Sequence, residues 1–157
     1  MEQITCLGQI QTPWPGVLAY AADLDGIETG RRTLFGYVRK DNDGNYIAIL
    51  SKSLSEGERR FMLARARAMS RMDALSVSGT SLHAFFDKDR RRTTKEIDEL
   101  AVRLLIPEHE IRKTFRNLVI PVSTSVAKAL GLPVEPVRIR LKQLGLYGLC
   151  IDAPANY

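Results

Sequence analysis

The sequence is poor in cysteine, histidine and tryptophan. Its 157 residues include two cysteines, two histidines and one tryptophan. Cys6 and Cys150 lie near opposite ends, without the paired spacing of a metal-binding or redox motif, so we expect both thiols to be reduced. This scarcity excludes a disulfide-rich fold and leaves few side chains that bind zinc. A chain of this length buries a sufficient core without such cross-links.

Long apolar runs are also absent. No stretch of about 18 consecutive apolar residues occurs, so we expect no membrane-spanning helix. The first residues, Met1 to Cys6, lack the basic and apolar regions of a secretory signal, which indicates a cytoplasmic protein. The apolar content of 45% and charged content of 26% are typical of a globular protein. We therefore expect residues 1–157 to form a single domain.

Positive charge is in excess. The net charge is +5, and the isoelectric point is about 9.4. Most of the excess lies in residues 59–71, 88–95 and 138–142. This balance permits an acidic partner, either protein or nucleic acid. The simpler interpretation of each cluster is a solvated helix face or loop.

The clearest pattern in the N-terminal half predicts a β-hairpin over residues 32–51. Two β-rich runs, 32–40 and 45–51, flank Asp41-Asn42-Asp43-Gly44, and Asp-Gly is a strong turn signal. Before the hairpin, the alanine-rich segment 17–24 favours a short helix.

Two capping boxes predict helix starts. Ser55 with Glu58 predicts a helix from residue 56 to about 75. Thr93 with Glu96 predicts a second helix over residues 95–105, which Pro107 ends.

The rest of the chain reads as short elements. Segment 76–92 is loop-like and segment 118–122 strand-like, and three further helices are predicted at 108–115, 123–130 and 135–144. The predicted fold class is α+β, a helix-rich single domain with a small β-sheet and a C-terminal helical pair.

Three segments, taken in order, carry a resemblance. They are Leu54–Ala64, Glu96–Pro107 and Val126–Leu146. Together with the hairpin, they resemble the ImmA/IrrE family of zincin-like metallopeptidases, which accompany phage and mobile-element repressors. In that family the first segment is followed by His-Glu-x-x-His, and the second reads Glu-Ala-Asn-x-Phe-Ala-x-x-Leu-Leu-Met-Pro. The resemblance covers residues 35–146 and implies a zincin-like active-site helix. It also implies that active relatives recognise, and often cleave, a helix-turn-helix repressor.

The positions that the resemblance assigns to catalysis are degenerate. Arg65, Ala66 and Met69 stand where the family has the first His, the Glu and the second His. A guanidinium does not bind a metal, alanine offers no general base, and methionine offers only a soft thioether. Glu96 stands at the third zinc ligand, but one carboxylate does not make a zinc site. We therefore expect no catalytic residues, no metal, no cofactor and no peptidase activity.

Glu96 has two interpretations. It completes a capping box with Thr93, or Arg65 has replaced the metal and pairs with the Glu96 carboxylate, because an unpaired buried charge is costly. A rebuilt metal site is a weaker alternative, since the remaining candidate ligands share no ligand spacing. These candidates are His83, His109, Asp87, Cys6 and Cys150.

Two surfaces are candidates for binding. Aromatic and basic side chains occur together in one segment and favour protein binding, with a solvated loop as the alternative. They are Phe85, Phe86, Arg90, Arg91 and Arg92. Residues 123–146 resemble a helix-turn-helix, in which Arg138, Arg140 and Lys142 are candidate DNA contacts. The family's own fold contains this segment, so the pattern does not require DNA binding.

The leading hypothesis is therefore a non-catalytic pseudo-metallopeptidase, a regulatory protein of a phage or mobile element. It would bind a helix-turn-helix repressor or another regulator and act as an antirepressor or co-regulator. The alternative is a DNA-binding transcriptional regulator that uses the basic C-terminal pair. An enzyme with a different site has no support, because the sequence shows no nucleophile–base pair, phosphate loop or carboxylate dyad.

Overall fold

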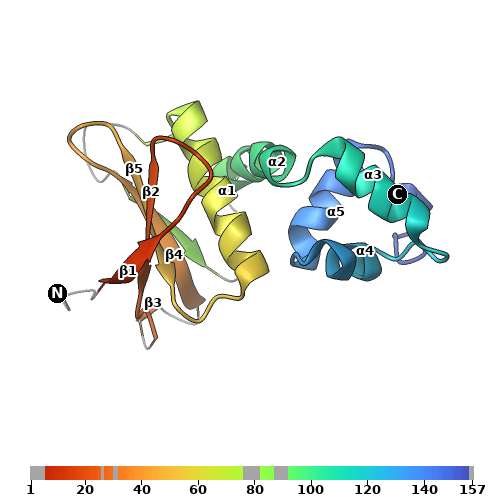
Figure 1. The fold of residues 1–157 in the computed structure, drawn as a ribbon, viewed down its shortest axis with the longest axis horizontal. Helices are drawn as coiled ribbons and strands as arrows, with labels where there is room; N and C mark the ends of the chain where they lie inside the picture. The colour runs from red at the N-terminus through yellow and green to blue at the C-terminus, as the bar shows by residue number, and fades with distance from the viewer. Residues whose placement is uncertain (1–5, 26, 30–31, 76–81, 87–91, 156–157) are drawn as a thin grey trace.

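A mixed β-sheet and a set of helices make up the fold (Figure 1). The computed structural model describes residues 6–25, 27–29, 32–75, 82–86 and 92–155. The strands are β1 (Cys6–Ile10), β2 (Val17–Ala22), β3 (Glu28–Thr29), β4 (Arg32–Lys40), β5 (Tyr46–Ser51) and β6 (Leu82–Phe86). The helices are α1 (Glu56–Met72), α2 (Arg92–Leu105), α3 (Glu108–Asn117), α4 (Ser123–Leu130), α5 (Val134–Gln143) and the 3-10 turn η1 (Tyr147–Leu149). The predicted α+β class is confirmed.

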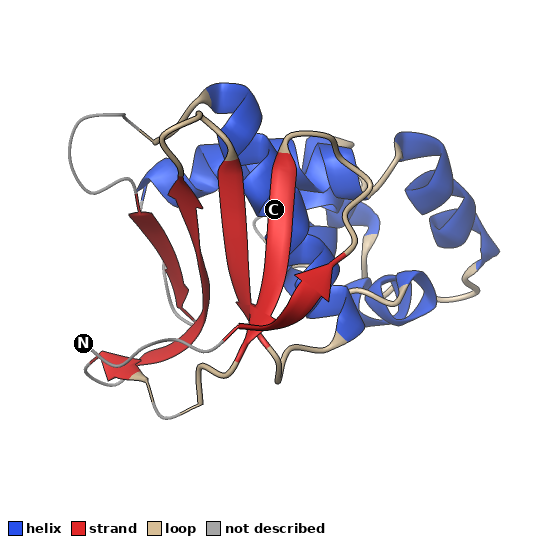
Figure 2. Ribbon diagram, turned by 60° about the vertical axis from the view of Figure 1, so that its left-hand side comes forward, coloured by secondary structure: helices blue, strands red, loops and turns tan. Residues whose placement is uncertain are grey.

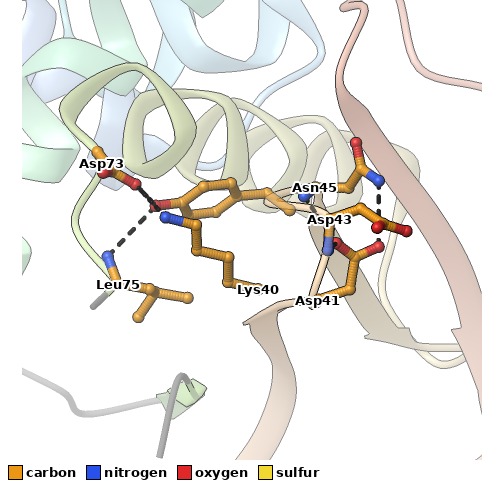
Figure 3. Close-up of polar contacts among 7 residues, drawn as sticks. Lys40, Asp41, Asp43, Asn45, Asp73 and Leu75 are labelled. Atoms are coloured by element: carbon orange, nitrogen blue, oxygen red, sulfur yellow. Dashed lines mark hydrogen bonds and ion pairs between the residues drawn. The ribbon is translucent and has the colours of Figure 1, made fainter. Parts of the chain in front are cut away.

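The strands form one sheet in the order β1-β2-β5-β4-β3, with β6 also paired to β4 (Figure 2). Strand β2 runs parallel to β5, and the other pairings are antiparallel. The predicted hairpin is confirmed as β4–β5. Its turn closes on Asp41, whose Oδ1 accepts hydrogen bonds from the backbone N–H groups of Asp43 at 2.9 Å and Asn45 at 2.8 Å (Figure 3). Gly44 adopts φ +84°, which explains the glycine in the turn.

Alternate residues of β5 face two different apolar layers. Ala48 and Leu50 belong to the main core, which includes residues of α1, and Ile47 and Ile49 belong to a smaller cluster with Ala22. Because successive side chains of a strand point to opposite faces, this division means that β5 is covered on both sides. All six residues of β5 are buried, as expected for a central strand with a continuous apolar sequence.

Three sequence predictions concerning strands are wrong. Segment 17–24 contains β2 instead of a helix, because pairing with β1 and β5 outweighs the helix preference of its alanines. Segment 76–92 was expected to be a loop, but its residues 82–86 form β6 against β4. Segment 118–122 is an irregular link between α3 and α4, without a pairing strand among the described residues.

Helix α1 begins as predicted and lies against the sheet (Figure 1). Ser55 Oγ accepts from Glu58 N at 3.2 Å, and Glu58 Oε2 accepts from Ser55 N at 3.3 Å, so the capping box is confirmed. The helix ends at Met72, three residues earlier than predicted, because Asp73 adopts the left-handed conformation at φ 45°.

The C-terminus of α1 is tied to the hairpin by Asp73. Its Oδ1 accepts from Lys40 Nζ at 2.8 Å and from Tyr46 Oη at 2.7 Å (Figure 3). Tyr46 Oη also accepts from Leu75 N at 3.3 Å. Burial and the bond to Asp73 raise the pKa of Tyr46 to about 12. The bonds from Lys40 and Tyr46 lower the pKa of Asp73.

Helices α3, α4 and α5 form a group that α5 joins to α2 (Figure 1). The predicted helical pair is confirmed, with Gly131 at φ 67° ending α4. Helix α2 begins at Arg92, so Thr93 lies in its first turn and not at the N-cap that the sequence predicted. No helix in the described ranges has both the length and the apolar character needed to cross a bilayer.

The helical group also packs directly on the start of α1. A Cβ atom at Gly57 would lie 2.5 Å from the Gly131 carbonyl oxygen, so the helix approaches the α4–α5 turn at a distance that only glycine permits. One continuous apolar core includes residues of the sheet, α1, α2, α4 and α5. The sheet and the other helices therefore pack around α1, the helix on which positions 65, 66 and 69 lie.

Candidate functional site

The three degenerate positions are all buried. Arg65 is 6% exposed, and Ala66 and Met69 are fully buried. Ala66 and Met69 belong to the main core, together with Ala68 of the same helix. A catalytic metal needs an open coordination position beside its protein ligands. This part of α1 presents buried apolar side chains and a buried arginine in place of such an opening.

Arg65 forms a buried ion pair with Asp98 of α2. Its Nε donates to Asp98 Oδ1 at 2.6 Å, and its Nη2 donates to Oδ2 at 2.9 Å. The two side chains are 7% and 9% exposed. This two-bond fork is the strongest arrangement of guanidinium and carboxylate in proteins. It joins α1 to α2 in the interior of the fold.

Two further side chains of α1 surround the guanidinium. The Arg65 carbon Cζ lies 4.1 Å from the centre of the Phe61 ring, a cation–π distance. Arg65 Nη1 also lies 3.7 Å from the sulfur of Met62. The two side chains lie four and three positions before Arg65, at Phe61 and Met62, and therefore on the same side of the helix. The surroundings of the guanidinium thus come partly from its own helix. The pair is electrically neutral and holds no free base, nucleophile or metal ligand.

The expected pairing of Arg65 with Glu96 is wrong. The carboxylate in the fork belongs to Asp98, and the Glu96 side chain is exposed. The reason is the helical period. Positions two apart in a helix differ by about 200° around its axis. Because Asp98 points toward α1, Glu96 points away from it. The position that the resemblance assigns to the third zinc ligand therefore does not face Arg65.

A signal for Asp98 was present in the sequence. The buried apolar residues of α2 include Ala101, Val102 and Leu105, which stand three, four and seven positions after Asp98. That spacing places Asp98 within the apolar stripe of the helix. An acidic residue within such a stripe requires a buried partner.

The alternative metal ligands are not brought together. Among the described residues, no group of three or more His, Cys, Asp or Glu side chains is placed to hold a metal ion. Cys6 and His109 are exposed, whereas Cys150 is buried, and burial raises the pKa of its thiol. His83 lies in β6, and Asp87 lies outside the described residues.

One cleft that α1 lines has no catalytic groups. This cleft of about 310 Å³ is bounded by the β1–β2 loop and the end of α2. Its lining residues are Pro13, Trp14, Arg60, Leu63, Leu104 and Leu105. Positions 65, 66 and 69 do not line it, so the cleft is separate from the positions to which the resemblance assigns catalysis.

The candidate DNA contacts on α5 are mostly occupied by intramolecular bonds. Arg140 is 8% exposed, and its Nε donates to the carbonyl oxygen of Ile106 at 2.9 Å. It therefore binds a carbonyl at the C-terminal end of α2, as basic side chains often do, and burial lowers its pKa. The assignment of Arg140 to DNA is wrong, because a buried guanidinium does not reach a phosphate.

The other two candidates on α5 are more accessible. Arg138 is half-buried, donating from Nε to Ser123 Oγ at 3.0 Å and from Nη2 to Asp152 Oδ2 at 3.4 Å. Its charge is thus partly neutralised by Asp152. Lys142 is exposed, with Nζ 5.1 Å from the centre of the Tyr147 ring.

The candidate protein-binding residues are only partly placed. Phe85 and Phe86 end strand β6, and Arg92 begins α2. Arg90 and Arg91 lie outside the described residues. The described part of the segment thus includes strand β6 and the start of α2, and its role as a binding surface stays a prediction.

Comparison with protein-family models, with curated proteins and with solved structures finds no match for this chain.

Proposed function

We propose that this protein is a non-catalytic regulator that acts by binding another protein. The observation that supports this proposal best is the Arg65–Asp98 ion pair, which is buried between α1 and α2 where a zincin-like enzyme would need an accessible metal. A neutral, buried pair of this kind favours one arrangement of the helices and offers nothing to a substrate.

The burial of the neighbouring positions supports the same proposal. Restoring a metal site here would place ionisable groups at Ala66 and Met69, which are both fully buried. Burying such groups without partners is strongly unfavourable. The helix is therefore adapted to packing, and the protein acts through its surface.

The resemblance indicates which partner to test first. Members of the ImmA/IrrE family recognise helix-turn-helix repressors of phages and mobile elements. A protein that keeps this recognition without cleavage would sequester or remodel the repressor as an antirepressor or co-regulator in the cytoplasm. In a wider form of this proposal, the partner is another regulatory protein in place of the repressor.

Direct DNA binding is the alternative, and it has less support. The helix-turn-helix-like pair is present, but Arg140 donates a hydrogen bond to the Ile106 carbonyl and Arg138 forms an ion pair with Asp152. Specific readers of DNA use basic side chains that reach phosphates and base edges. Of the three candidates on α5, only Lys142 is exposed.

The test combines a purified helix-turn-helix repressor, encoded beside this gene, with the protein in the presence and absence of Zn²⁺. We expect a complex on size-exclusion chromatography and an unchanged intact mass of the repressor in both conditions. Zinc-dependent cleavage would contradict the non-catalytic proposal. The absence of a complex at micromolar concentration would contradict the choice of partner.

A gel shift separates the DNA-binding alternative from this proposal. The DNA upstream of the gene is titrated with the protein at several salt concentrations. A complex that keeps sequence preference and weakens steeply with salt would favour direct DNA binding. We expect no sequence-specific shift without the repressor.

A further inference from the structure

Four large aliphatic side chains gather on the surface beyond the helical group. Val119 is 98% exposed, Ile120 57%, Leu149 64% and Ile151 69%. The two segments lie side by side, because Ile151 N donates to the Pro121 carbonyl oxygen at 2.9 Å. Exposed apolar patches mark interaction sites in proteins. We call these four residues the aliphatic surface.

A polar network holds the aliphatic surface in place. Asp152 Oδ1 accepts from Ser123 N at 2.9 Å, its Oδ2 accepts from Ser123 Oγ, and Arg138 donates to both residues. Ser123 is fully buried. The link after α3 and the segment after η1 are therefore fixed to α4 and α5. A surface fixed in advance loses less entropy on binding.

The charges beside the aliphatic surface that come from α3 and the link after it are positive, and the one carboxylate next to Ile151, that of Asp152, is paired with Arg138. Between Ile111 and Val134 the chain has four basic residues and no acidic one. Of these, Lys113, Arg116 and Lys128 are exposed. Arg116 lies in the last turn of α3, three residues before Val119, so positive charge borders the patch. An acidic partner complements this surface, whereas a second copy would bring the same basic side chains and its own net charge of +5.

The size of the patch favours a single helix as its occupant. Four aliphatic side chains of this exposure present on the order of 500 Å², less than the ~800 Å² that each partner buries in a standard interface. One amphipathic helix, which binds through apolar residues on one face, fits this size. A lipid surface fits less well, because segments 116–122 and 149–153 contain no aromatic residue of the kind enriched at bilayer interfaces.

We propose that the aliphatic surface is the docking site for an acidic amphipathic helix of the protein that this chain regulates. This inference rests on the proposed function and names the surface and the chemistry of its partner. The helix places its apolar face against Val119 and Ile151, and its carboxylates lie beside Lys113 and Arg116.

The probe is a labelled peptide that carries Leu at the helical spacing i, i+3, i+4, i+7 and Glu at the other positions. Fluorescence anisotropy measures its affinity for the protein, and the affinity of the same peptide with Lys in place of each Glu. We expect the Glu peptide to bind at least about tenfold more tightly than the Lys peptide, because like charges oppose the latter. The double substitution Val119→Ser/Ile151→Ser should weaken binding of the Glu peptide by about tenfold or more.

Two further variants separate charge from apolar contact. Lys113→Ala/Arg116→Ala should weaken binding several-fold and reduce its dependence on salt. Leu7→Ser is the matched control, because Leu7 is 56% exposed on β1, at the sheet, and its loss should leave binding unchanged. All variants should unfold at the urea midpoint of the unsubstituted protein.

Several outcomes would overturn this inference. One is equal binding of the two peptides, or binding that Val119→Ser/Ile151→Ser leaves unchanged. A dimer that this substitution dissociates would assign the surface to a second copy, and binding to phosphatidylserine vesicles that it abolishes would assign the surface to a membrane. A repressor complex that survives the substitution would leave the proposed function in place and refute this surface. Peptide binding without any repressor complex would support the surface and refute the repressor as partner.

Discussion

The buried pair of Arg65 and Asp98 makes a quantitative prediction about stability. Asp98→Asn removes the carboxylate charge that faces the guanidinium, in a site where both side chains are less than one-tenth exposed. Breaking one partner of a buried ion pair costs about 3–5 kcal/mol. A domain of this size is stable by about 5–15 kcal/mol, so the substitution removes much of its stability. Arg65→Met should cost a similar amount, because it strands the carboxylate.

The double variant Arg65→Met/Asp98→Leu should recover most of that loss. It removes both charges and fills the space with apolar atoms, and such replacements are often neutral or stabilising. In a double-mutant cycle with the single variants Arg65→Met and Asp98→Leu, the coupling free energy equals the two single losses together minus the loss of the double variant. It should therefore exceed either single loss of about 3–5 kcal/mol. With a shift of about 2–4 °C per kcal/mol for a domain of this size, each single variant should melt about 6–20 °C lower.

The assay is urea unfolding, followed by circular dichroism and by the fluorescence of Trp14. Trp14 is the only tryptophan and packs against the main core, so coincident transitions from the two probes establish two-state unfolding. Glu96→Gln is the matched control on the same helix and should change stability by less than about 0.5 kcal/mol. A loss below about 1 kcal/mol for Asp98→Asn, or an equal loss for Glu96→Gln, would refute the assignment of a buried Arg65–Asp98 pair.

Three further predictions concern the links that hold α1 and the C-terminal group. Tyr46→Phe removes the hydrogen bonds of the hydroxyl with Asp73 and Leu75, and it should cost about 1–2 kcal/mol in urea unfolding; an unchanged midpoint would contradict the bonding of Asp73. Gly57→Ala should destabilise the protein by about 1–3 kcal/mol, although alanine favours helices, because its Cβ would meet the carbonyl oxygen of the α4–α5 turn at 2.5 Å; a rise in melting temperature would show that the approach is looser. Burial alone would raise the pKa of Asp152, but the hydrogen bonds from Ser123 outweigh it and lower that pKa. Its ionised form therefore stabilises the fold above the ordinary carboxyl pKa of about 4, and this contribution is lost as the pH falls through the lower pKa of the folded state. Asp152→Asn should flatten the decline of stability below about pH 4, and an unchanged pH profile would argue against the network.

Local chemistry made part of the fold predictable. The turn of the β4–β5 hairpin depends on Asp41 and Gly44, whose preferences act within a few residues. The start of α1 depends on Ser55 and Glu58 in the same way. The pair α4–α5 follows from helical spacing on both sides of Gly131. In each case the interacting groups are neighbours in the sequence, so their pattern carries the information.

The site was only partly predictable. The sequence identified Arg65 as a charged residue that cannot bind a metal. The structure places it in the interior as one half of an ion pair. The choice of Asp98 over Glu96 depends on which face of α2 meets α1, and that angle is set by packing. Likewise, Arg140 reads as a surface residue in its basic segment, but the contact of α5 with the end of α2 buries it.

The sequence by itself determined the class of the fold, the hairpin, the start of α1 and the C-terminal helical pair. Only the tertiary structure decided that segment 17–24 is a strand, that Asp98 neutralises Arg65, and that the aliphatic surface remains exposed. The physical reason is the range of the forces involved. Turn and capping preferences act between near neighbours, whereas strand pairing, burial of charge and exposure of apolar groups depend on residues that are distant in the chain.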